Sequence, residues 1–137
     1  PGGKQGVVNE MVQNIDYAPT FLEAAGVKVP SDIQGCSLLP LLQGKKPANW
    51  RKSLYYHYYE YPAEHSVCRH YGIRTKRYTL IHFYNDIDSW ELYYLKKDPS
   101  QLHNIYGQKG TEKLTERLKK ELKELQVQYN DPIRNQY

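Results

Sequence analysis

The chain has 137 residues, of which 39% are hydrophobic and 25% are charged, and its formal net charge is +4. This length fits one ordinary domain or a piece of a larger protein, and the composition excludes a disordered chain. No apolar run approaches the roughly 20 residues that cross a bilayer, so we expect no membrane span. The basic residues are dispersed and alternate with Glu in the last third. We therefore expect no nucleic-acid partner, which would favour a clustered basic patch.

The opening segment, PGGKQGVVNE, has neither a basic start nor an apolar core, so it does not resemble a signal peptide. It also lacks an initial Met, and we expect the chain to be cut from a longer protein whose targeting signals lie elsewhere. Cys36 and Cys68 lie far apart without C-x-x-C spacing. They could form one disulfide, although the spacing favours two free thiols.

The first fifty residues predict a strand, a helix and a loop. The pattern places a short strand over 7–14, a helix over 16–25 and a helical turn over 38–42. Asp16 is the expected N-cap of the helix, Pro19 lies in its first turn, and Gly26 follows its end.

Four strand-like runs follow, over Leu54–Tyr61, Cys68–Thr75, Tyr78–Tyr84 and Trp90–Leu95. Only two residues separate the second run from the third, which predicts a tight hairpin and an antiparallel meander. In the third run Leu80, His82 and Tyr84 share one face, and Ile81 and Phe83 share the other. Both faces are therefore expected to be covered at least in part.

Thr111–Tyr129 is the clearest predicted helix. Its leucines recur at 114, 118, 122 and 125, and Glu and Lys fill the remaining faces. A single Leu stripe fits packing on the sheet. The sequence thus predicts an α+β fold, in which a four-stranded antiparallel sheet is packed by a C-terminal amphipathic helix. We expect residues 1–50 to be the end of a preceding domain and residues 51–137 to form a unit of their own.

The chain contains no recognisable nucleophile, phosphate-loop or metalloprotease motif. His65, Arg69 and His70 are the candidate substrate-binding residues, because Arg and His together suit an anionic or hydroxylated ligand. A strand would point Arg69 and His70 to opposite faces. The main alternative is structural, with Arg69 and Arg74 paired to Glu60, Glu64 or Glu91.

Two other features of the sequence could indicate a binding site. His65, Cys68 and His70 could be drawn as zinc ligands, but no fourth ligand is spaced to close the site, so we expect no metal. The 14 tyrosines, against two phenylalanines, fit a half-exposed sheet or docking face, or else a surface on which sugar rings stack.

Four segments, read together, resemble the C-terminal part of the formylglycine-dependent sulfatases of the alkaline phosphatase superfamily. They are NIDYAPTFLEAAGVKVPSDIQGCSLLPLL, WRKSLYYHYYEYP, HYGIRTKRYTLIHFY and WELYYLKKDPSQLHNI. The resemblance is collinear and points to bacterial polysaccharide sulfatases of the N-acetylglucosamine-6-sulfatase or iduronate-sulfatase-like type. Cys36, Tyr94 and Gln101 depart from residues common in the family, at positions that affect packing and turns.

The resemblance implies a hydrolase of sulfate esters, with a sulfated sugar as substrate. The family's C/S-x-P-x-R nucleophile motif is absent after both Cys36 and Cys68. Formylglycine and calcium are therefore expected in the intact enzyme but not in this fragment, which should be inactive when isolated. Its partner would be its own N-terminal catalytic domain, whose pocket it helps to shape. The resemblance implies a periplasmic or extracellular location.

Two other functions remain open at this stage. The chain could be a stand-alone module that binds an anionic glycan or nucleic acid through Tyr and Arg. It could also be a purely structural or oligomerisation domain, with the Leu-striped helix as its interface.

Overall fold

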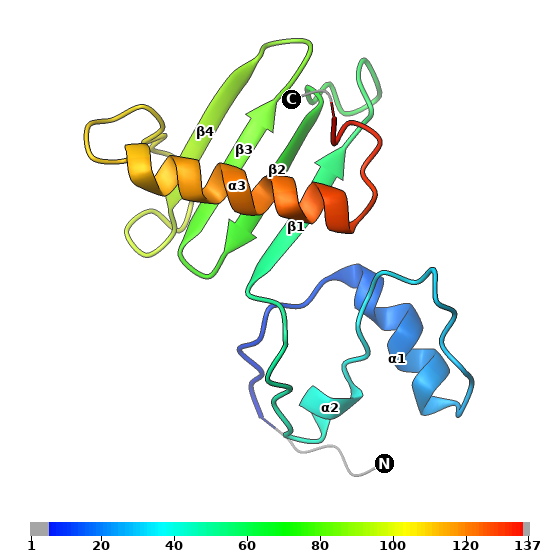
Figure 1. Cartoon of the computed structure of the whole chain (residues 1–137). Coiled ribbons are helices and arrows are strands. Elements are labelled where there is room, and N and C mark those ends of the chain that lie inside the picture. The colour runs from blue at the N-terminus through cyan, green and yellow to red at the C-terminus, as the bar shows by residue number, and fades with distance from the viewer. Residues whose placement is uncertain (1–5, 136–137) are drawn as a thin grey trace. The chain divides into compact units, whose positions relative to one another are not determined.

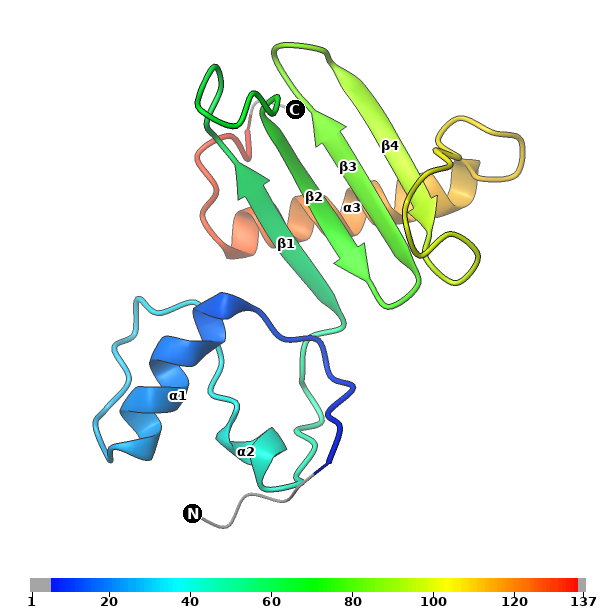
Figure 2. The same cartoon turned by 180° about the vertical axis from the view of Figure 1, so that it is seen from behind.

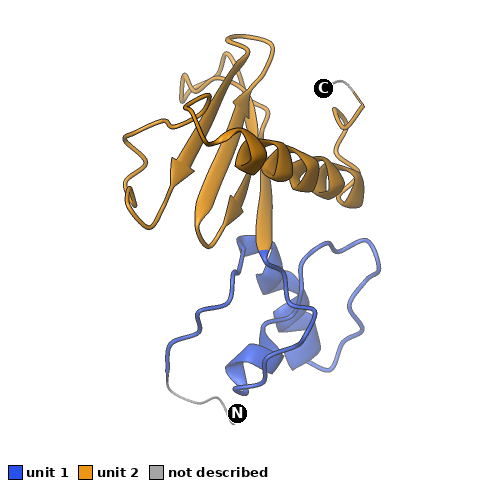
Figure 3. Cartoon of the chain, turned by 60° about the vertical axis from the view of Figure 1, so that its left-hand side comes forward, with its two compact units in different colours: residues 1–52 blue, residues 53–137 orange. Residues whose placement is uncertain are grey.

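The computed structural model describes residues 6–135 (Figure 1). The chain forms two compact units, which divide between Lys52 and Ser53 (Figure 3). Unit 1 contains the 3-10 helix η1 (Asn14–Asp16) and the helices α1 (Tyr17–Ala24) and α2 (Leu39–Leu42). Unit 2 contains β1 (Ser53–Tyr58), β2 (His70–Thr75), β3 (Tyr78–Phe83), β4 (Ser89–Tyr94) and α3 (Glu112–Gln128).

Unit 2 is the predicted meander. Its strands lie in the order β1-β2-β3-β4, and each pairs antiparallel with the next. The helix α3 crosses one face of the sheet, as the front and back views show (Figures 1 and 2). The expected α+β fold is therefore confirmed.

The core of unit 2 lies between α3 and the sheet. Register places Ile73, Leu80 and Leu92 side by side in the sheet, and all three are fully buried. From the helix, Leu118 and Leu122 pack into this cluster at 1% and 2% exposure, and the other two leucines of the stripe pack at its edge. Burying an apolar side chain of this size stabilises the fold by about 1.5–3 kcal/mol.

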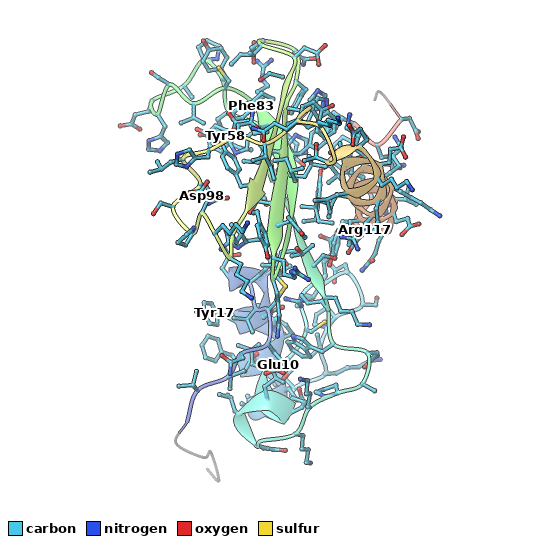
Figure 4. All side chains as sticks on the ribbon, turned by 90° about the vertical axis from the view of Figure 1, so that its left-hand side faces the viewer. Glu10, Tyr17, Tyr58, Phe83, Asp98 and Arg117 are labelled. Atoms are coloured by element: carbon cyan, nitrogen blue, oxygen red, sulfur yellow. The ribbon has the colours of Figure 1, made fainter. Side chains whose placement is uncertain are left out.

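The opposite face of the sheet is rich in aromatic side chains. Figure 4 shows Tyr58 and Phe83 on the side away from α3, which carries Arg117. Gly72 also lies on this face, and the Tyr56 ring lies directly over it. A Cβ at Gly72 would come within 2.5 Å of the Tyr56 hydroxyl and 2.7 Å of the Leu80 carbonyl oxygen. Only glycine fits at this position without movement of its neighbours.

Two predicted strands were too long at the same end of the sheet. The first run was expected to reach Tyr61 and the second to begin at Cys68, but β1 ends at Tyr58 and β2 begins at His70. These two residues are the last partners in the β1–β2 register. Residues 59–69 have no partners in the β1–β2 ladder, so they form a loop.

In unit 1 the strand predicted over residues 7–14 is wrong. Residues 7–13 are irregular and η1 begins at Asn14, because no strand among the described residues of unit 1 is available to pair with them. The predicted end of the next helix is confirmed. Gly26 has a positive φ of 71°, and the amides of Gly26 and Val27 close the helix by donating to the carbonyls of Glu23 and Leu22.

Asp16 stands at the N-cap position of α1, but its side chain does not cap the helix. The carboxylate is fully buried and accepts two hydrogen bonds from Arg51, at 2.5 and 2.7 Å. It also accepts the backbone N–H groups of Gln13 and Cys36. Burial in itself raises the pKa of Asp16, but these donors outweigh it and hold the pKa below its ordinary value. Asp16 thereby ties three separate segments of unit 1 together.

We predict that Gly72→Ala destabilises unit 2 by about 1–3 kcal/mol, because the new methyl group must displace the Tyr56 ring and the backbone of β3. Denaturant unfolding followed by circular dichroism measures the change. Gly6→Ala is the matched control, since nothing lies within 4 Å of its added Cβ. Equal stability of the two variants would contradict the packing described for this face.

We predict that Asp16→Asn destabilises the protein by about 3–5 kcal/mol at pH 7, because it leaves the Arg51 charge buried without a counter-charge. The pKa of Asp16 is lowered in the folded state, so its contribution is complete above the ordinary Asp pKa of about 4 and is lost as pH falls through the folded-state value.

The difference between wild type and Asp16→Asn should therefore narrow below about pH 4. Denaturant titrations between pH 3 and 7 test this, with the exposed Asp32→Asn as control. A difference that stays constant over that pH range would show that the ionised carboxylate is not the source of the stability.

Candidate functional site

The candidate site lies at one end of the sheet of unit 2, in the loop of residues 59–69 and the β3–β4 turn beside it. Arg69 joins the two segments, with its Nη1 atom 3.9 Å from a carboxylate oxygen of Asp86. The same segments carry three exposed apolar side chains, Tyr59, Val67 and Ile87, at 41–56% exposure. This end of the sheet thus combines polar groups with uncovered apolar surface.

Arg69 braces the loop from within. Its Nε–H donates to the Tyr59 carbonyl at 3.2 Å, and its Nη2 donates to the Tyr61 carbonyl. The sequence suggested that Arg69 pairs with Glu60, Glu64 or Glu91. Arg69 forms no ion pair with any of these three residues. A guanidinium carries five N–H donors, and these two carbonyls use two of them. The remaining donors leave Arg69 able to contact an anion while it holds the loop in shape.

His70 begins β2 and lies on the aromatic face away from α3. Its ring stacks on Tyr58 at a centroid distance of 5.5 Å and contacts the tilted Phe83 ring at 5.2 Å. Nδ1 lies 2.9 Å from the Cys68 carbonyl oxygen and must carry the hydrogen, because a carbonyl oxygen only accepts. Nε2 forms no hydrogen bond within the described residues and is the atom available to a ligand.

His65 and the cysteines complete the candidate set. His65 lies in an exposed turn of the loop, and the Ser66 amide next to it donates to the Ala63 carbonyl. His65 and Arg69 therefore lie in the loop, and His70 is the strand residue that directly follows it. Cys36 and Cys68 are both free thiols. Among residues 6–135 no group of three or more His, Cys, Asp or Glu side chains could hold a metal ion.

A buried polar cluster lies next to this loop. The sequence analysis did not predict it. Asp131, in the tail after α3, accepts hydrogen bonds from Tyr55 at 2.5 Å and from His57 Nδ1 at 2.6 Å. The other nitrogen of His57 lies 2.6 Å from the Tyr84 hydroxyl. The Asp131 side chain is only 1% exposed.

The electrostatics of this cluster suit an ionised carboxylate. Burial in itself raises the pKa of Asp131, but the hydrogen bonds from Tyr55, His57 and the Ile133 amide outweigh it and lower the pKa. Burial and the neighbouring carboxylate raise the pKa of Tyr55. The order Asp–His–Tyr looks like a catalytic relay. At 2% and 1% exposure, however, the side chains of His57 and Asp131 cannot meet a substrate, so the cluster supports the structure.

A second buried histidine is also structural. The His82 ring stacks on Trp90 at 4.1 Å, and its nitrogens contact the Tyr71 hydroxyl and Asp88. Burial lowers the pKa of His82, and the hydrogen bond to Asp88 opposes part of that shift. Lys119 of α3 lies over the same Trp90 ring at 3.9 Å, a cation–π contact that fastens the helix to the sheet.

Fold and site together define a small α+β domain with a candidate anion-binding loop at one end of its sheet. The sequence model of the N-sulphoglucosamine sulphohydrolase C-terminal family matches residues 1–128. The chain belongs to this sulfatase family, within the alkaline phosphatase superfamily, as the four sequence segments indicated.

Among curated proteins the chain is similar to the N-acetylglucosamine-6-O-sulfatase of Bacteroides thetaiotaomicron, with 62% identity over 120 residues. The match covers 86% of this chain and 22% of that protein. The arylsulfatase K of Xenopus laevis is 33% identical over 107 residues, which cover 74% of this chain and 20% of that protein. The chain thus spans about a fifth of the length of these relatives.

Solved structures agree. One described as a complex with the substrate D-glucosamine-2-N,6-O-disulfate is 61% identical, with a TM-score of 0.81, and the match covers 85% of this chain and 24% of that one. A putative sulfatase from Bacteroides thetaiotaomicron is 27% identical, with a TM-score of 0.85, over 98% of this chain and 29% of that one. No helix within residues 6–135 has the length and apolar character to span a membrane.

Proposed function

We propose that this chain is the C-terminal part of a sulfatase that hydrolyses sulfate esters of sulfated sugars. The observation that carries the proposal is the 62% identity to an N-acetylglucosamine-6-O-sulfatase over 86% of the chain. The structure that shares 61% identity holds a glucosamine sulfated at two positions. A 6-O-sulfated glucosamine is therefore the substrate that we expect for the intact protein.

In this proposal the reacting groups lie in the N-terminal domain, outside this chain. The described residues offer no cluster that fits calcium, and neither cysteine stands in a motif that could become formylglycine. We therefore assign both cofactors to the rest of the protein and expect the isolated chain to be inactive. A periplasmic or extracellular location follows from the same family argument.

The exposed face of α1 supports the proposal that unit 1 packs against a partner outside this chain. Tyr17 and Phe21 are 57% and 70% exposed and lie 6.4 Å apart between ring centroids. Ala18, Ala24 and Ala25 are also exposed, and together these five residues form an apolar stripe at helical spacing. Such a stripe is normally buried, so we propose that unit 1 belongs to the catalytic domain and that the stripe packs within it.

The loop of residues 59–69 is the part that we propose to border the substrate pocket. Arg69 can donate to a sulfate or carboxylate of the sugar, and His70 offers a ring nitrogen to a hydroxyl or N–H group. His65 lies further out on the same loop. Binding energy from such non-reacting parts of a substrate orients the ester for attack.

Alanine at His65, Arg69 or His70 in the intact protein should each lower kcat/KM for 6-O-sulfated glucosamine by about tenfold, the loss of roughly 1.4 kcal/mol of binding. Release of inorganic sulfate measures the rate. His103→Ala is the matched control, because the His103 ring is 82% exposed on the loop after β4; it should change kcat/KM less than twofold. An unchanged kcat/KM in all three alanine variants would contradict the assignment of these residues to the substrate pocket.

A further inference from the structure

The tail after α3 reaches the candidate loop through a continuous set of contacts. The Tyr59 ring lies on the His57 ring, with 3.7 Å between centroids and 26° between planes. Its hydroxyl lies 3.4 Å from the same Asp131 oxygen that His57 and Tyr55 contact. Tyr59 is thus held at its ring by His57 and at its hydroxyl by Asp131.

The orientation of His57 is fixed from both sides. The Asp131 carboxylate holds Nδ1 and the Tyr84 hydroxyl holds Nε2, each at 2.6 Å. A ring with both nitrogens engaged and 2% of its side chain exposed cannot turn without breaking a buried hydrogen bond. Asp131, 74 positions later in the chain, therefore fixes the orientation of the His57 ring on which the Tyr59 ring lies.

Tyr59 in turn fixes the loop. It is the first residue after β1, and its carbonyl accepts the Nε–H of Arg69, which closes the base of the loop. Its side chain is 52% exposed, so little else within the described residues holds it in place. The path from tail to loop is therefore Asp131 to His57, His57 to Tyr59, and Tyr59 to Arg69.

We infer that Asp131 is a positioning residue for the substrate-binding loop of residues 59–69. The inference rests on the proposed function for its effect on catalysis, but not for its effect on the loop. Asp131 lies beyond residue 128, where the family match ends. In this inference its carboxylate acts on the loop through His57 and Tyr59.

The first test is independent of activity. In the intact protein, Asp131→Asn should raise hydrogen–deuterium exchange of amides 59–69 about tenfold relative to wild type. Exchange in the β2–β3 turn, at the other end of the sheet, should stay within twofold. Glu124→Gln, an exposed carboxylate-to-amide change on α3, is the matched control and should leave both regions unchanged. No change in the loop, or an equal rise in both regions, would overturn the inference.

The second test uses kinetics. Asp131→Asn should raise KM for 6-O-sulfated glucosamine about five- to tenfold and change kcat less than twofold, because it displaces binding groups and not reacting groups. Tyr59→Ala should reproduce this split with little change in Tm, since Tyr59 is half exposed. It covers the case in which Asp131→Asn fails to fold. A lower Tm with unchanged KM would make Asp131 a purely structural residue.

The two tests separate two kinds of failure. An intact wild-type protein that releases no sulfate would contradict the proposed function and leave the exchange result to decide the inference. Normal sulfatase activity, with loop exchange unchanged in Asp131→Asn, would overturn the inference and leave the proposed function intact.

Discussion

The β1–β2 pairing ends at Tyr58 opposite His70, and the candidate site depends on that end point. Up to this pair, the backbone hydrogen bonds of the β1–β2 ladder fix the direction of each side chain. Beyond it β1 and β2 no longer pair, and the polar groups of the loop need other partners, as where the Tyr84 amide donates to the Arg69 carbonyl. The Arg69 side chain is another such partner and donates to two loop carbonyls. The same register places His70 between Tyr58 and Phe83. The end of the β1–β2 pairing therefore determines both where the loop begins and which rings surround His70.

Periodic elements were the part of the fold that sequence could predict. The Leu stripe of α3, the four strands and the glycine end of α1 each follow from a local pattern that repeats or terminates. The short strand over residues 7–14 failed because alternation does not supply a partner. The overextended ends at Tyr61 and Cys68 failed for the same reason. Local pattern predicts what a segment can form, and pairing decides where it ends.

The two buried aspartates show why much of the polar structure could not be predicted. Asp16 was expected to cap a helix, and no pattern in the sequence singled out Asp131. Each is buried because its partner comes from elsewhere, Arg51 at 35 positions and Tyr55 at 76 positions in the sequence. An isolated buried carboxylate is costly, and these distant donors add to the nearby Gln13 and Ile133 amides to make its burial favourable. No local motif encodes such a pairing. His65, Arg69 and His70, by contrast, are close in sequence, so their common position at one end of β2 follows from the chain itself.

The helix α3 and the tail after it have different roles. The helix packs on the core, and the tail provides directed hydrogen bonds. The helix packs through Leu118 and Leu122 onto a core of aliphatic and tyrosine side chains, where one apolar residue can be exchanged for another of similar volume. The tail acts through Asp131, whose carboxylate depends on directed hydrogen bonds and has no apolar substitute. A change in the core alters stability over the whole unit, whereas a change in the tail acts on His57 and the loop above it. The position of the loop therefore depends on a few directed hydrogen bonds in the tail, whereas the sheet and helix depend on apolar packing.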